Sequence, residues 1–424
     1  MKFRFGLLCA LMGASSVLAA NDFALKNGDR VVFYGDSITD QRLYTVITET
    51  YVVTRYPDLN VSFVHSGWGG DKVSGGGGGP IDLRLQRDVI PYKPTVMTIM
   101  LGMNDGLYKP ENEATDETFF NGYKHIVESV RAALPGIHIT AIKPSPYDDV
   151  TRAPNFPGGY NEVMISFGKW IGNYGEKAGL NVADLNNGEV EMLRKADALN
   201  PPEAQKILPD RVHPSFAGHM VMAEGLLTSW NARPVVAAVV IDASGTHPVL
   251  KSSEHAKVSQ LSGTNGIQWT ELDDALPLPL AEWEHSANNN NPVSLVLRSS
   301  DVAERLNSEP LKVTGLKSGV YSLRIDGEIV GTFNNDELAR GVNLGLQETP
   351  MSKQAEEVYQ LTVRHCSIHN DRWRTVQVPL AKYTDLPGVQ AAEQSADALE
   401  QAVVQKRHEA GQPKPHTFIV SAVS

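Results

Sequence analysis

The feature that most constrains the fold is an alternation of short apolar runs and helix-like stretches between Arg30 and Trp230. Five runs are rich in β-branched residues and close on turn-forming or polar residues, as strands covered on both faces do: VVFYG, VSFVHSG, TVMTIMLG, IHITAIKP and NVADLN. Apolar residues recur at steps of three and four from Phe119 to Leu134, which predicts an amphipathic helix. Together these patterns predict a three-layer α/β/α domain built on a parallel sheet.

The pattern changes after Ala232. Strand-like runs now lie among turn signals: PVVAAVVIDA, PVSLVLRS, EPLKVTGL and GVYSLRIDGEIVGTF. The last run contains Asp326-Gly327, a strong signal for a two-residue hairpin. Helical patterns return near Thr349 and continue to a Pro-flanked tail. We therefore expect an α/β domain at 21–232, a β-rich appended domain at 233–349 and a helical C-terminal segment at 350–424.

Residues 1–20 have the pattern of a secretory signal peptide. Lys2 and Arg4 precede a short apolar run, and small residues lead to a cleavage point near Ala19 or Ala20. Export to the periplasm or the extracellular space is expected. Cleavage leaves Cys366 as the single cysteine of two, so we expect a buried thiol and no intramolecular disulfide.

The chain has a formal net charge of −11 and no basic run. This balance argues against a nucleic acid or an anionic membrane as a partner. No segment after the signal has the length of apolar sequence that a spanning helix needs, so membrane insertion is not expected. A neutral small molecule or polysaccharide, such as a glycan ester, fits this composition better.

The tripeptide Gly35-Asp36-Ser37 directly follows the first strand-like run. This position puts the Ser37 hydroxyl at the carboxyl edge of the sheet, where folds of this class place their sites. Ser37 is then a candidate nucleophile, and the alternative is that Ser37 or Thr39 merely caps the next helix. The chain has no Gly-x-Ser-x-Gly elbow, so the α/β-hydrolase fold is not supported.

A serine nucleophile needs a base, and the base needs a carboxylate that orients it. Asp210 and His213 lie three residues apart in a segment bounded by Pro209 and Pro214, which predicts a loop or turn. The alternatives are that both residues are ordinary loop residues, or that Asp210, His213 and His219 hold a metal ion.

Acyl transfer also needs hydrogen-bond donors for the oxyanion of the tetrahedral intermediate. Two further strand ends offer them: Gly70 has a backbone N–H in VHSGWGGDKV, and Asn104 has a side-chain amide in LGMNDG. Each is an ordinary turn residue when taken alone. Four strand or loop ends nevertheless supply the residue types that one ester-hydrolysing centre requires.

These motifs resemble those of the SGNH (GDSL) hydrolase superfamily over residues 30 to 230: Gly35-Asp36-Ser37, Gly70, Gly102-Met103-Asn104-Asp105, and Asp210 to His213. The resemblance implies a flavodoxin-like catalytic domain, with Ser37 as nucleophile, His213 as base and Asp210 as its orienter. It further implies an oxyanion hole made by the N–H groups of Ser37 and Gly70 and by Asn104, with no metal and no cofactor. Asp36 is expected to be structural. One departure is His65, where many members have Asn.

Several residues around this centre are candidates for substrate contact. Trp68 and Tyr108 flank the oxyanion residues, and each can stack on a sugar, line an acyl pocket or pack on the sheet. The glycine run at 74–80 either approaches a ligand or forms a mobile loop. The long irregular stretch at 144–160 is typical of a lid or a specificity element.

The predicted function is an exported serine esterase that hydrolyses acyl esters, with removal of acetyl groups from carbohydrate as its expected task. A lysophospholipase or thioesterase is the alternative among enzymes. A catalytically silent glycan-binding protein of the cell envelope is the alternative from another class, with the β-rich part as the binding module.

Overall fold

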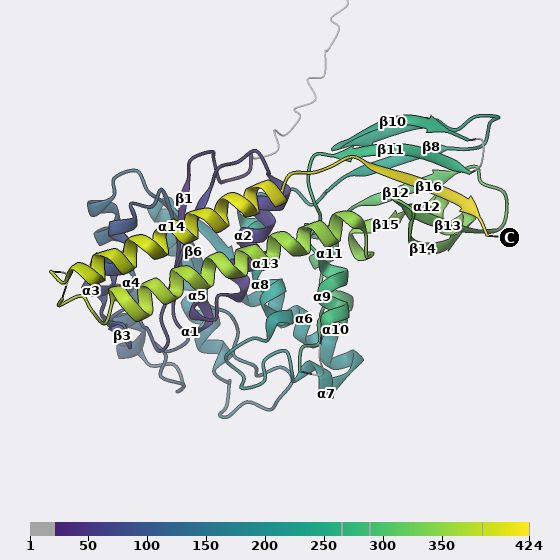
Figure 1. Ribbon diagram of the computed structural model, residues 1–424. Coiled ribbons are helices and arrows are strands. Elements are labelled where there is room, and N and C mark those ends of the chain that lie inside the picture. Colours follow the sequence, from purple (N-terminus) through teal and green to yellow (C-terminus); the bar gives the residue numbers. More distant parts are fainter. Residues whose placement is uncertain (1–21, 264–265, 288–289, 384, 424) are drawn as a thin grey trace, which may run out of the picture.

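The computed structural model describes residues 22–263, 266–287, 290–383 and 385–423 (Figure 1). The expected signal peptide lies outside these described residues. The first sheet has the strand order β2-β1-β5-β6-β7, and every neighbouring pair is parallel. Its strands are β1 (Arg30–Gly35), β2 (Ser62–Gly67), β5 (Val96–Met100), β6 (His138–Lys143) and β7 (Asn181–Asp184). The predicted parallel α/β/α domain is confirmed.

Helices cover both faces of this sheet. Right-handed crossovers put α2 (Leu43–Arg55) on one face and α3 (Ile81–Asp88), α4 (Glu113–Ala133) and α5 (Asn161–Ala178) on the other. Helix α8 (Phe216–Ser229) packs beside α2. The apolar stripe predicted for α4 is buried as expected, because Phe119, Tyr123, Ile126, Val127 and Val130 all face the core. Helices α6 (Asn186–Leu199) and α7 (Pro201–Ala204) lead towards the loop that carries Asp210 and His213.

Two further sheets form the second part of the chain. One has the order β10-β11-β16-β13-β14 and the other β15-β12-β8-β9. Their strands are β8 (Ala238–Asp242), β9 (Val249–Glu254), β10 (Ala256–Ser262), β11 (Ile267–Asp273), β12 (Pro310–Thr314), β13 (Val320–Ile325), β14 (Glu328–Asn334), β15 (Val342–Asn343) and β16 (His416–Ala422). Asp326 and Gly327 join β13 to β14 with φ of 51° and 86°, which confirms the hairpin signal.

Two expectations for this part are wrong. The run PVSLVLRS is helix α10 (Val293–Ser299), flanked by α9 (Leu280–Ser286) and α11 (Val302–Leu306), and these helices share the core of the α/β domain. Val293 and Val296, three positions apart, are fully buried there, so tertiary packing overrides the β propensity of valine. The tail also ends in β16, which lies between β11 and β13. The expected domain boundaries at 232 and 349 stay predictions.

The C-terminal segment is otherwise a helical hairpin. Helices α13 (Pro350–Asp371) and α14 (Pro387–Ala410) run side by side along the α/β domain, joined through the π-helical turn η3 (Arg372–Gln377) (Figure 1). Helix α13 packs on α2 and β2. Cys366 is buried, as expected. Among the described residues, no helix combines the length and the apolar character that crossing a membrane requires.

A buried ion-pair network holds this hairpin to the sheet. Glu49 of α2 accepts a hydrogen bond from Nε2 of His65 at 3.0 Å, and the Nδ1 atom of His65 accepts from Thr45 at 2.9 Å. The same carboxylate pairs with Arg407 of α14 and lies 3.1 Å from His365 of α13. The departure noted at His65 thus has a structural role, because this imidazole is part of the contact between the sheet and the hairpin.

Candidate active site

The carboxyl ends of three neighbouring strands bring the predicted site residues to one edge of the sheet. Gly35 lies opposite Gly67 on one side and Met100 on the other, so the loops after β1, β2 and β5 leave the sheet together. Short helix α1 (Ser37–Asp40) lies directly against these strand ends. A Cβ atom on Gly67 would lie 2.3 Å from the backbone nitrogen of Asp40, so this approach requires glycine.

Ser37 is the first residue of α1, and Asp36 is its N-cap. The Asp36 carboxylate accepts from the N–H of Ile38 at 3.0 Å, while Thr39 bonds the Tyr44 hydroxyl at 3.0 Å. Burial raises the pKa of Asp36 to about 7, although the bond from Ile38 opposes the rise. The alternative that Ser37 or Thr39 caps the helix is therefore wrong, and the Ser37 hydroxyl is left for another partner.

That partner is His213. Its Nε2 lies 2.7 Å from Oγ of Ser37, and its Nδ1 lies 2.7 Å from Oδ2 of Asp210. A carboxylate can only accept, so Nδ1–H donates to Asp210, and Nε2 of the neutral ring accepts from the Ser37 hydroxyl. The second oxygen of Asp210 accepts from the N–H groups of Val212 at 3.0 Å and His213 at 2.8 Å.

The two contacts of the imidazole form a continuous chain from carboxylate to hydroxyl, and the two backbone contacts hold the carboxylate in place. Partial burial alone would raise the pKa of Asp210, but the hydrogen bonds from His213 and Val212 hold it below its usual value. Asp210 is consequently a carboxylate at neutral pH. The arrangement matches the geometry in which an imidazole takes a proton from an activated serine.

His219 does not join this group. Its Nδ1 accepts from the N–H of Tyr44 at 3.2 Å, and its Nε2–H donates to Gln41 at 3.1 Å. Burial lowers the pKa of His219 to about 3, so the ring is neutral. The side chain of Gln41 in turn donates to the carbonyl of Pro214 at 3.3 Å. His219 thus braces the residue that follows His213, and no metal-ligand cluster with it is found among the described residues.

The irregular stretch at 144–160 braces the same loop from the other side. Arg152 donates to the carbonyls of Gln205 at 2.8 Å and Leu208 at 2.9 Å, and Asp148 N–H donates to Arg211 at 2.9 Å. Arg211 itself has a φ of 71°, a strained value for a residue with a side chain. The stretch predicted as a lid or specificity element therefore also fixes the turn that carries Asp210 and His213.

Gly70 and Asn104 lie on two loops that a hydrogen bond links. Asn104 Nδ2 donates to the carbonyl of Asp71 at 3.1 Å, and the Tyr108 hydroxyl donates to Asn104 Oδ1 at 3.1 Å. These two bonds show that Nδ2 carries the N–H groups, and one of its two N–H groups has no partner among the described residues. Gly70 is exposed with a φ of 75°. Tyr108 is 44% exposed, and its expected contact with substrate stays a prediction.

The glycine run forms a small hairpin, β3 (Gly75–Gly76) with β4 (Gly79–Pro80), that packs behind the Gly70 loop. A Cβ atom on Gly76 would lie 2.4 Å from the carbonyl oxygen of Gly70, and one on Gly77 would lie 2.7 Å from that of Gly69. The expected ligand contact of this run stays a prediction. The absence of side chains at Gly76 and Gly77 lets the backbone of this hairpin pack directly against the backbone of the Gly70 loop.

Three arginine side chains cover the ring of Trp68. The guanidinium carbon of Arg374 lies 3.4 Å from the Trp68 ring centroid, and Arg87 and Arg84 lie at 5.0 and 5.3 Å. Packing thus occupies the ring, and a contact between Trp68 and substrate stays a prediction. The sequence had pointed to none of these arginines, and Arg374 has no motif near it that marks it as part of the site.

A serine hydroxyl, an imidazole and a carboxylate hydrogen-bonded in series at the edge of a parallel sheet are the groups that a serine hydrolase uses, and the family match over the same part of the chain makes the class a serine ester hydrolase. The family that matches is the GDSL-like Lipase/Acylhydrolase family, over residues 33–221. This catalytic part of the chain belongs to the SGNH (GDSL) hydrolase superfamily, as its motifs had implied.

Two similar proteins extend this result. An acetylxylan esterase from Geobacillus stearothermophilus is 26% identical over 229 residues, which are 47% of this chain and 93% of that protein. The solved structure of a gut microbial diltiazem-metabolizing enzyme has a TM-score of 0.78 and 24% identity, and covers 94% of this chain and 98% of its own. The second similarity shows that the whole architecture, including the sheets and the hairpin after the α/β domain, is a shared fold.

Proposed function

We propose that this protein removes short acyl groups, acetyl above all, from carbohydrate esters by a Ser37-His213-Asp210 mechanism. The observation that carries the proposal is the hydrogen-bond chain from Asp210 through His213 to Ser37, with 2.7 Å at each contact of the imidazole. The similarity to an acetylxylan esterase supports the acyl group and the alcohol. The net charge of −11 favours a neutral substrate.

In this mechanism Ser37 Oγ attacks the ester carbonyl while His213 Nε2 takes its proton. Asp210 stabilises the imidazolium that forms. The oxyanion accepts hydrogen bonds from the N–H groups of Ser37 and Gly70 and from the free N–H of Asn104. The imidazolium then protonates the leaving alcohol, and the base activates water to release the acid and restore Ser37.

The same proposal puts the mature enzyme outside the cytoplasm, after cleavage near Ala20. N-terminal sequencing of protein secreted by the native host tests that part. An unprocessed N-terminus would refute it without affecting the chemistry.

The decisive experiment measures hydrolysis of p-nitrophenyl esters from acetate to palmitate, followed by acetic acid release from acetylated xylo-oligosaccharides. Ser37→Ala is expected to lose at least about a thousandfold in kcat. Ser215→Ala is the matched control, because this serine lies two residues from His213 and its hydroxyl has no hydrogen-bond partner among the described residues. Preference for long chains would indicate a lipid hydrolase, and equal activity in Ser37→Ala and wild type would refute the mechanism.

A further inference from the structure

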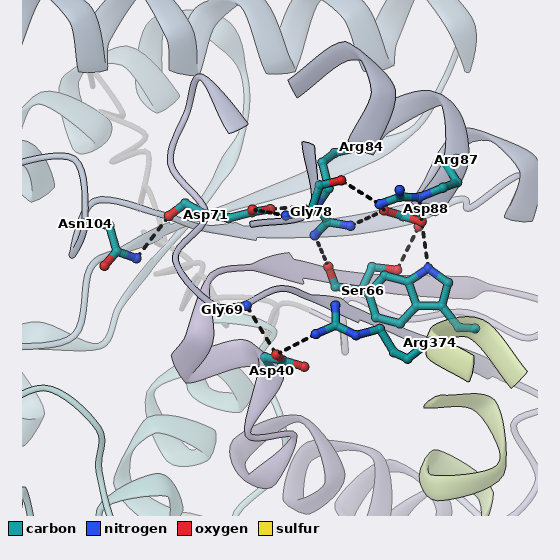
Figure 2. A network of polar contacts seen from close by, with 11 residues as sticks. Asp40, Ser66, Gly69, Asp71, Gly78, Arg84, Arg87, Asp88, Asn104 and Arg374 are labelled. Carbon is teal, nitrogen blue, oxygen red and sulfur yellow. Dashed lines mark hydrogen bonds and ion pairs between the residues drawn. The ribbon is translucent and has the colours of Figure 1, made fainter. Parts of the chain in front are cut away.

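The loop that carries Gly70 is tied to the nucleophile helix through one carboxylate. Oδ2 of Asp40, the last residue of α1, accepts from the N–H of Gly69 at 3.2 Å. The same oxygen lies 3.3 Å from Nη2 of Arg374, which comes from the turn of the C-terminal hairpin (Figure 2). Arg42 lies 3.4 Å from Oδ1 of the same carboxylate, so Arg374 and Arg42 together balance the charge of the group that links Ser37's helix to the Gly70 loop.

Arg374 makes a second contact with the same loop. Its guanidinium lies flat on the indole of Trp68, two residues before Gly70, at 3.4 Å from the ring centroid. A cation that is partly removed from water over an indole face is among the stronger contacts of this kind. One side chain from outside the α/β domain thus contacts the loop directly at Trp68 and reaches Gly69 through Asp40.

The neighbouring residue fixes the position of this turn. Nε1 of Trp373, a side chain that is 2% exposed, donates to Asp88 at 2.7 Å. Arg84 bonds the same Asp88 and also donates to Asp71 at 2.6 Å. Asp71 follows Gly70 directly, so the hairpin turn is connected to both flanks of the predicted oxyanion donor (Figure 2).

We infer that Arg374 is a positioning residue of the esterase, which holds the Gly70 N–H where the oxyanion forms by bracing Asp40, Gly69 and Trp68. This inference rests on the proposed function, and it gives the C-terminal helical hairpin a role in supporting the Gly70 loop. Oxyanion donors act when they are preorganised about 2.7–3.1 Å from the position of the oxyanion, and a misplacement of about 1 Å can cost about a hundredfold in rate. A loop with glycines at 69 and 70 has little stiffness of its own, so external support has a direct effect on the reaction.

The test compares Arg374→Ala and Arg374→Lys with Arg372→Ala. Arg372 is the matched control, since it lies in the same turn but pairs with Asp397 of α14 at 2.6 Å. We expect Arg374→Ala to lower kcat for p-nitrophenyl acetate about tenfold, with KM changed less than about twofold. The affinity for a boronic acid, whose tetrahedral adduct on Ser37 carries the negative charge, is expected to fall by a similar factor. Arg374→Lys keeps the charge at Asp40 and is expected to recover part of the loss.

A double variant shows whether Arg374 acts through the predicted partner. In the background of Asp40→Asn, the change Arg374→Ala is expected to lower kcat less than about threefold, because the shared contact is already lost. The inference is overturned if Arg374→Ala keeps the kcat of wild type, or if Arg372→Ala loses as much kcat and boronate affinity as Arg374→Ala. Either result leaves the proposed function intact as long as Ser37→Ala is inactive, whereas an active Ser37→Ala would refute both.

Discussion

The turn that carries Asp210 and His213 and the loop that carries Gly70 are supported in different ways. The first is braced within the α/β domain, by Arg152 and by the Gln41 contact to Pro214. The second is braced by a glycine hairpin and by Arg374, which lies 334 positions after Asp40.

Substitutions in the two segments are therefore expected to affect the reaction in different ways. At the turn with Asp210 and His213, called the base side, the hydrogen bonds determine the tautomer of the imidazole, so a substitution there changes which nitrogen is protonated. At the Gly70 loop, called the oxyanion side, packing determines the position of the Gly70 N–H, so a substitution there changes its distance from the predicted oxyanion. The base side is expected to respond to small chemical changes, and the oxyanion side to small steric ones.

The largest effect is expected from Asp210→Asn. Oδ1 of residue 210 accepts two backbone N–H groups, so the new amide keeps its oxygen there and turns its NH₂ towards Nδ1 of His213. The imidazole must then carry its proton on Nε2, where it can no longer accept from Ser37. We expect kcat to fall by about two to four orders of magnitude, with the fold intact.

Steady-state kinetics on p-nitrophenyl acetate check this prediction, with Asp301→Asn as a control at an exposed aspartate that pairs with Arg305. A loss of less than about tenfold in Asp210→Asn would mean that the tautomer does not control the reaction.

The same division explains what the sequence could and could not predict. Asp210 and His213 lie in one short turn that follows a clear sequence pattern of strands and helices. Their proximity to Ser37 therefore follows from the topology of a parallel sheet. The prediction of Gly70 and Asn104 as oxyanion donors has the same basis. Arg374 was missed because nothing local marks it, and its role depends on how a distant hairpin docks. Helix α10 and strand β16 were misassigned for a related reason, since their conformation is decided by partners far along the chain.

On the oxyanion side, Gly76→Ala is expected to have an intermediate effect. The new Cβ would lie 2.4 Å from the carbonyl oxygen of Gly70 and 2.8 Å from Cα of Asp71, and both are backbone atoms that cannot rotate away. The Gly70 loop must therefore shift, and we expect kcat to fall about 10- to 100-fold with a smaller change in KM.

Gly188→Ala is the matched control for this substitution, because nothing lies within 4 Å of a Cβ at that position. Kinetics and thermal unfolding of both variants separate the local shift from a general loss of stability. If Gly76→Ala keeps the kcat of wild type, then the reaction does not depend on the position of the Gly70 loop at the scale of this shift.

The smallest effect on kcat, and a clear effect on stability, is expected from His365→Gln in the contact between the hairpin and the sheet. Burial alone would lower the pKa of His365, but Glu49 and Glu400 raise it to about 9. A raised histidine pKa gives stability that is complete below pH 6.5 and is lost as the pH rises through 9. We expect His365→Gln to reduce the free energy of unfolding by about 3 kcal/mol at pH 6, and by much less at pH 9.5.

Urea unfolding of both proteins at pH 6, 7.5 and 9.5 measures this difference. A difference that stays constant with pH would mean that His365 is neutral in the fold, and that uncharged contacts hold the hairpin on the sheet.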